Sequence, residues 1–81
     1  MSTINILSVM LKKNEELILL GQKIKTIRID KKLSQEQLAS KCDFDRTYIS
    51  MLERGKRNPS YLNLLKLCNG LEITINRLLE D

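Results

Sequence analysis

The stretch 34–54 constrains the fold more than any other part of this chain. Its apolar residues recur three and four positions apart, which is the spacing of a buried helix face, and no alternating strand pattern competes with it. Ser34 followed by Gln37 is a capping box, which predicts that a helix begins there. Asp43 tolerates the left-handed backbone of a sharp turn, and Asp45 can cap a second helix. The stretch therefore predicts two short helices joined by a tight turn.

A small residue and its apolar neighbours predict how these two helices pack. Ala39 is expected where the helices cross, because only a small side chain fits between them. Leu38, Ile49 and Leu52 are expected to pack around it, and Gly55 is expected to end the second helix. The opposite face of the second helix is then left outside this contact.

That outer face carries side chains that suit contacts with base edges or thymine methyl groups. Its members are Arg46, Thr47, Ser50 and Met51. The major groove of DNA admits one α-helix and presents donor and acceptor groups that distinguish the base pairs. A helical hairpin that binds no ligand is the alternative, because paired helices are common. The residue types on this face favour DNA binding.

Further helices are predicted on both sides of this pair. The first begins at Asn14, after a break at Lys12–Asn14, and extends to Lys32. Another runs from a Ser60 cap to Asn69–Gly70, and a short helix covers about residues 74–79. The apolar stripe of the first contains Leu17, Leu20, Ile24 and Ile27, and that of the second contains Leu62, Leu65, Cys68 and Leu71, with Leu64 and Leu67 beside it. The apolar residues of the last are Ile75, Leu78 and Leu79.

The chain is thus expected to be an all-α domain of five helices. The domain is predicted over residues 14–81, with the helix-turn-helix motif at about 35–54. Residues 1–13 are predicted to be an N-terminal extension, either a short helix capped by Ser2 or Thr3 or an irregular arm.

Positive charge is concentrated on the predicted helical pair and the helix before it. Residues 23–57 contain ten Lys and Arg against five Asp and Glu, whereas the whole chain has a net charge of +4. A polyanionic partner explains this distribution, and an ordinary solvated surface is the alternative.

Composition offers no catalytic or metal-binding chemistry. The chain has no histidine, and Cys42 and Cys68 lack the close spacing of a metal site, so neither an enzyme nor a metal or other cofactor is expected. Both cysteines fall at apolar helix positions, which predicts buried free thiols and a reduced, cytoplasmic setting. The longest apolar run, Leu17–Leu20, is too short for a bilayer, and no secretory signal is recognisable, so no membrane association is expected.

Several strings resemble a known family. Gln35–Ala39 and Ile49–Ser60 are similar to the helix-turn-helix of phage repressors of the Cro/C1 or Xre-like type, and the resemblance covers roughly residues 22–79. It implies a lambda-repressor-like fold and a bacterial or phage cytoplasm as the setting. The strings Asp45–Ser50 and Glu53–Asn58 resemble the controller proteins of restriction–modification systems. Those are small all-helical dimers that regulate their own gene and the endonuclease gene.

The resemblance implies roles for individual residues. Those expected to read bases are Arg46, Thr47, Ser50, Met51 and Arg57. Those expected to contact phosphates are Gln35, Tyr48, Lys56 and Asn58. Arg28 and Glu53 are expected to form a buried ion pair between the first and third helices. Arg46 can bond both O6 and N7 of a guanine.

A homodimer is expected because one reading helix covers only a few base pairs. A two-fold dimer places its reading helices about 34 Å apart on a pseudo-palindromic operator in double-stranded DNA. RNA polymerase is a further candidate partner. The interface is expected to contain Leu64, Ile73, Ile75 and Leu79, although the last helix could instead only cover the monomer core. A phage-type repressor and a toxin-binding antitoxin are the alternative functions.

Overall fold

The protein is built from α-helices throughout the part that the structure describes. This computed structural model describes the backbone of residues 6–80 and the side chains of residues 15–80. The helices are α1 (Ile6–Asp30), α2 (Gln35–Cys42), α3 (Arg46–Glu53), α4 (Tyr61–Leu71) and α5 (Ile75–Leu79). The all-α prediction is confirmed, with each helix of the predicted pair in its predicted place. No described helix has the length and apolar character needed to cross a membrane.

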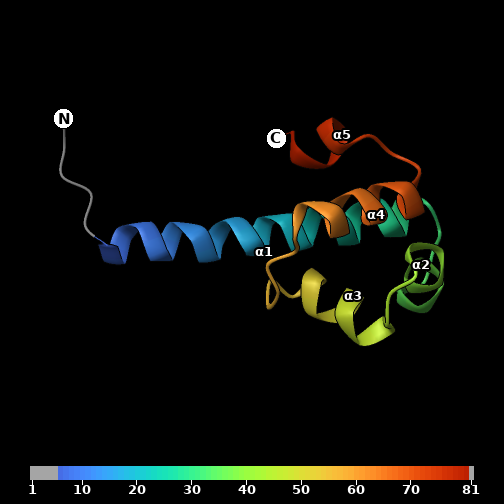
Figure 1. Cartoon of the computed structure of the whole chain (residues 1–81), viewed down its shortest axis with the longest axis horizontal. Coiled ribbons are helices and arrows are strands. Elements are labelled where there is room, and N and C mark those ends of the chain that lie inside the picture. The colour runs from blue at the N-terminus through green and yellow to red at the C-terminus, as the bar shows by residue number, and fades with distance from the viewer. Residues whose placement is uncertain (1–5, 81) are drawn as a thin grey trace.

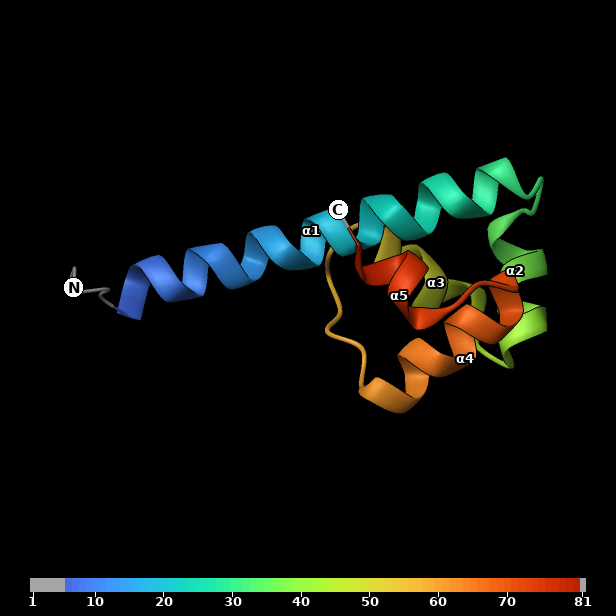
Figure 2. The ribbon, with the colours of Figure 1, turned by 90° about the horizontal axis from the view of Figure 1, so that it is seen from above.

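The long helix α1 is the axis of the fold. The other helices gather around its C-terminal half, with α2 and α3 on one side and α5 on another (Figure 1). The N-terminal half of α1 projects beyond them in both views (Figure 2), and the molecule measures 45 × 24 × 21 Å. Helix α3 packs on α1 and α2, while α4 packs on α2 and α5. The helical pair, α2 and α3, therefore packs at the C-terminal half of α1.

The beginning of α1 differs from the sequence prediction. A break at Lys12–Asn14 was predicted, but the helix continues unbroken from Ile6 to Asp30. Lys is a good helix former and Asn costs only about half a kcal/mol in a helix, so neither residue stops one that neighbouring turns support. The predicted capping at Ser2 or Thr3 falls outside the described residues.

The core is aliphatic and matches most of the predicted stripes. Its fully or nearly buried members are Ile24, Ile27, Leu38, Ala39, Cys42, Ile49, Leu52, Leu67, Cys68, Leu71 and Leu78. The prediction was wrong at Leu62, which is 70% exposed, whereas Leu67, predicted beside the stripe, is fully buried. Leu62 lies in the first turn of α4, where none of the described side chains buries it, so helical spacing alone wrongly placed it on the buried face.

The end of α4 also differs from the prediction. Asn69–Gly70 was predicted to stop this helix, but α4 continues to Leu71 and Gly70 lies inside it. A Cβ on Gly70 would be 2.3 Å from Cys42 Sγ, so this glycine is a packing residue that lets α2 and α4 approach each other.

The four connections between the described helices share the same backbone conformation. Each contains one residue in the left-handed conformation, with φ between 58° and 72°: Lys32, Asp43, Gly55 and Glu72. After each helix, this residue donates its N–H to a carbonyl three residues back, and the next residue donates to one five residues back. This is the Schellman motif, which satisfies the free carbonyls at a helix end. The left-handed backbone predicted at Asp43 and the stop predicted at Gly55 are confirmed.

Candidate nucleic-acid interface

Helix α3 presents its first turn to solvent and its last turns to the core. Arg46 and Thr47 are exposed, whereas Ile49 and Leu52 are buried. Asp45 occupies the N-cap position without a side-chain capping hydrogen bond to any described residue. The N-terminus of α3 is therefore accessible to an outside partner, which is the geometry that base reading requires.

The remaining predicted base-reading residues lie at different depths. Ser50 and Met51, one turn after the exposed pair, are half-buried. The Ser50 carbonyl accepts a hydrogen bond from Arg54 Nε (3.3 Å). Arg57 is exposed in the loop after α3. Four of the five residues therefore share the outer face of α3, and the fifth comes from a separate segment.

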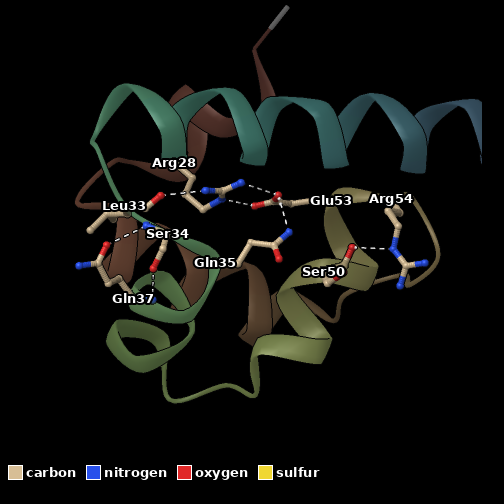
Figure 3. Close-up of polar contacts among 8 residues, drawn as sticks. All are labelled: Arg28, Leu33, Ser34, Gln35, Gln37, Ser50, Glu53 and Arg54. Carbon is tan, nitrogen blue, oxygen red and sulfur yellow. Dashed lines mark hydrogen bonds and ion pairs between the residues drawn. The ribbon is translucent and has the colours of Figure 1, made fainter.

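A buried ion pair anchors the end of α3 to α1. Arg28 Nε donates to Glu53 Oε2 at 2.6 Å, and Arg28 Nη2 donates to Glu53 Oε1 at 3.0 Å (Figure 3). Both residues are 8% exposed. Arg28 Nη1 also donates to the Leu33 carbonyl (2.8 Å), in the turn that leads into α2. The pair expected from the resemblance thus joins α1, α3 and the entrance to α2.

The side chain of Gln35 belongs to the same network. Its Nε2 donates to Glu53 Oε1 at 3.1 Å (Figure 3), and the residue is half-buried. The amide predicted to touch phosphate therefore also fixes the first turn of α2 against α3. Ser34 begins this helix through the predicted capping box, in which Gln37 N donates to Ser34 Oγ at 3.0 Å and Ser34 N donates to Gln37 Oε1 at 2.8 Å.

A close approach of two backbones sets where α3 lies on α1. A Cβ on Gly21 would be 2.4 Å from the Leu52 carbonyl oxygen and 2.7 Å from that of Glu53. A Cβ on Gly55, which has φ +72°, would be 2.9 Å from Ile18 Cα. Both glycines are required where α1 touches the end of α3 and the loop that follows it. Sequence reasoning missed Gly21, because one glycine in a helix does not reveal the element that approaches it.

The loop after α3 carries the predicted basic residues. Lys56, Arg57 and Asn58 are all exposed, and Pro59 is buried behind them. The Arg57 guanidinium lies 5.0 Å from the centre of the Tyr48 ring, a cation–π distance. The loop is thereby drawn toward the outer side of α3.

Tyr48 is at the centre of an aromatic cluster. Its ring meets Phe44 edge to face, with centres 4.8 Å apart and planes at 64°. Asn63 Nδ2 donates to Tyr48 Oη at 3.0 Å, and Lys66 Nζ lies 4.9 Å from the centre of the Phe44 ring. Sequence reasoning missed Asn63 and Lys66. Their spacing of three places them on one side of α4, but nothing in the sequence shows that this side faces the pair.

A hollow of about 460 Å³ opens beside this cluster. Its lining includes Thr47, Tyr48, Met51, Arg57 and Asn63. Residues from α3, the following loop and α4 therefore meet around one depression beside the outer face of α3.

The residues predicted for the dimer interface do not all lie free at the surface. Leu64, Ile73 and Ile75 are half-buried and pack against the core of their own chain. Leu79 is 56% exposed and lines a hollow of about 770 Å³ between α1 and α5, together with Leu19, Leu20, Lys23, Ile27 and Leu78. Leu19, at 57% exposure, adds to this apolar surface.

The two thiols are buried in the core as the sequence predicted. Burial raises the pKa of Cys42 to about 11, although the Gly70 backbone hydrogen bond and nearby Lys66 oppose the shift. Burial also raises the pKa of Cys68. Both groups are therefore protonated thiols at neutral pH, a state that neither attacks substrates nor binds metals well. Within the part that the structure describes, no three His, Cys, Asp or Glu side chains gather as a metal site.

Comparisons with known proteins match this geometry. A family model described as helix-turn-helix matches residues 24–78. The chain is 48% identical over 69 residues to the control protein C.MunI of Mycoplasma sp, a match that covers 84% of this chain and 93% of the relative. It is 47% identical over 64 residues to the control protein C.BamHI of Bacillus amyloliquefaciens, covering 78% of this chain and 79% of the relative.

A solved structure extends the likeness to the fold. The crystal structure of the restriction–modification controller protein C.AhdI from Aeromonas hydrophila superposes with a TM-score of 0.78 at 42% identity. The superposition covers 79% of this chain and 97% of that chain. About a fifth of this chain consequently has no counterpart there.

Proposed function

Because this chain belongs to the helix-turn-helix family of transcriptional regulators, we propose that it is the controller protein of a restriction–modification system. It binds operator DNA near the promoters of its own gene and the endonuclease gene. By occupying these sites it both activates and represses transcription. This places it in the cytoplasm with the DNA, where RNA polymerase is a candidate partner.

The exposed first turn of α3 is the observation that carries the proposal. Arg46 and Thr47 are exposed on a helix whose opposite face packs on α1 and α2. The helix can therefore enter the major groove of DNA as a rigid unit. Arg46 is the residue proposed to read guanine through two hydrogen bonds. Lys56 and Asn58 are proposed to contact phosphates beside it, because both are exposed in the adjoining loop.

A homodimer on a pseudo-palindromic operator completes the proposed mechanism. The exposed Leu79, with Leu19 across the hollow between α1 and α5, is the apolar surface that supports it. The half-buried Leu64, Ile73 and Ile75 would contribute mainly at its edge, because each already packs inside its own chain. Two copies related by a two-fold axis would double the bases read.

The proposal is tested by selecting a binding sequence from random DNA duplexes and measuring affinities for it. The variant Arg46→Ala is expected to lose about 5- to 150-fold in affinity for the selected sequence and to discriminate less at the guanine position. The variant Lys56→Ala should weaken binding to all sequences alike and lower the salt slope by about one. Lys56 is a cleaner phosphate probe than Gln35, whose amide also holds Glu53.

Two results would refute this function. One is a wild-type protein that enriches no sequence from the pool. The other is an Arg46→Ala protein that discriminates as well as wild type. For the dimer, sedimentation equilibrium at micromolar concentration should give the mass of two chains, and a single-chain mass with and without DNA would contradict it.

A further inference from the structure

Asn63 makes hydrogen bonds through both its backbone and its side chain. It lies in the first turn of α4, where its backbone N–H donates to the Ser60 capping hydroxyl at 3.1 Å. Its side-chain Nδ2 donates to Tyr48 Oη at 3.0 Å. A side chain held this way, on a helix fixed to the core, is a stable support for the half-buried tyrosine.

The direction of this hydrogen bond determines what the tyrosine hydroxyl can do. A phenol has one proton to donate and lone pairs that accept. Because Tyr48 Oη accepts from Asn63, its own proton remains available for another acceptor. Phosphate oxygens only accept hydrogen bonds, so the hydroxyl is prepared as a donor toward a DNA backbone.

The orientation of the Tyr48 ring also determines where Arg57 lies. The Phe44 edge contact and the Asn63 hydrogen bond hold the ring from two directions. The guanidinium of Arg57 then rests over its face at 5.0 Å. Without this surface, a long and exposed arginine in a loop would sample many rotamers and lose entropy on binding.

We propose that Asn63 is a positioning residue of the DNA interface, which orients Tyr48 as a phosphate donor and thereby holds Arg57 over the reading surface. This inference rests on the proposed DNA-binding function. Asn63 itself need not touch DNA, because its effect passes through the tyrosine that its amide holds.

A double-mutant cycle on the selected operator duplex tests the inference. The changes are Asn63→Ala, Tyr48→Phe and both together, with affinities measured by fluorescence anisotropy at several salt concentrations. Asn63→Ala and Tyr48→Phe are each expected to weaken binding about five- to tenfold. The double variant should bind the duplex no more weakly than the single variant with the lower affinity, because either change already removes the hydrogen bond between Asn63 and Tyr48.

Salt dependence provides a readout that a purely structural role would not change. Arg57→Ala should lower the salt slope by about one, and Asn63→Ala should lower it toward the same value. Asn69→Ala is the matched control, since Asn69 is exposed on the same helix. Far-UV circular dichroism at the assay temperature establishes that each variant is folded.

Additive losses in the cycle, an Asn63→Ala affinity equal to that of Asn69→Ala, or an unchanged salt slope would each overturn the inference. These outcomes are distinct from failure of the proposed function. In that case Arg46→Ala would also keep full discrimination, or the wild-type protein would select no operator.

Discussion

The substitution Glu53→Gln tests how much of the fold depends on the buried ion pair. It preserves the shape of the side chain but leaves the Arg28 guanidinium without its counter-charge at a position that is 8% exposed. The amide has one acceptor oxygen and a donor group, whereas the carboxylate accepts from Arg28 Nε, Arg28 Nη2 and Gln35 Nε2. One of its two ends must therefore place a donor against a donor.

The expected loss follows from these contacts. Hydrogen bonds to charged groups contribute about 1.5–3 kcal/mol each, and breaking a buried pair costs about 3–5 kcal/mol. Arg28 Nη1 keeps its bond to the Leu33 carbonyl, so the lower value, about 3 kcal/mol, is expected. A domain of this size has roughly 4–12 kcal/mol of stability in total. The melting temperature should fall by roughly 12–24 °C.

Urea unfolding followed by far-UV circular dichroism measures this loss. Glu36→Gln is the matched control, because Glu36 is an exposed carboxylate on α2 and its loss should change stability by less than about 0.5 kcal/mol. The double variant Arg28→Met, Glu53→Leu should regain part of the loss, since apolar side chains can replace a buried pair. The reasoning is refuted if Glu53→Gln and Glu36→Gln unfold at the same urea concentration, or if the double variant is less stable than Glu53→Gln.

Two further predictions concern the backbone. Gly21→Ala should destabilise the protein by about 1–2 kcal/mol, because a Cβ 2.4 Å from the Leu52 carbonyl oxygen must push α3 away, which outweighs the gain in helix propensity; Gln22→Ala, at an exposed neighbouring position, is the control in the same urea assay. Glu72→Gly should stabilise it by about 0.5–1 kcal/mol, because Glu72 has φ 58° and glycine adopts that conformation without strain. Glu72→Ala, which removes the charge but keeps the Cβ, should show no such gain, and an equal gain would contradict the argument.

The features that sequence predicted well are local ones. The capping box at Ser34, the left-handed Asp43 and the stop at Gly55 each depend on residues within one or two turns, and all three occur in the structure. Burial of Leu38 and Ile49 followed from spacing alone, because one face of each short helix must meet the other helix.

The features that the sequence could not predict depend on which helix packs against a given residue in the folded chain. Gly21 is required because the end of α3 lies against it, and Leu62 is exposed because nothing in the described part of the chain covers the start of α4. Asn63 reaches Tyr48 only after α4 has packed beside the motif. The pair Arg28–Glu53 was named through a family resemblance, since residues 25 apart give no local signal of contact.

The four left-handed turns close the C-terminal ends of α1, α2, α3 and α4 through hydrogen bonds to nearby residues. Each of these four helix ends is closed by hydrogen bonds spanning five residues or fewer, so its capping requires no contact with a distant segment. Small helical proteins with such local connections fold in microseconds to milliseconds. Ribosomes add about 5–20 residues per second, so synthesis of 81 residues takes several seconds. The time at which a newly made chain first reaches its folded state is therefore governed by translation, and folding adds no appreciable delay.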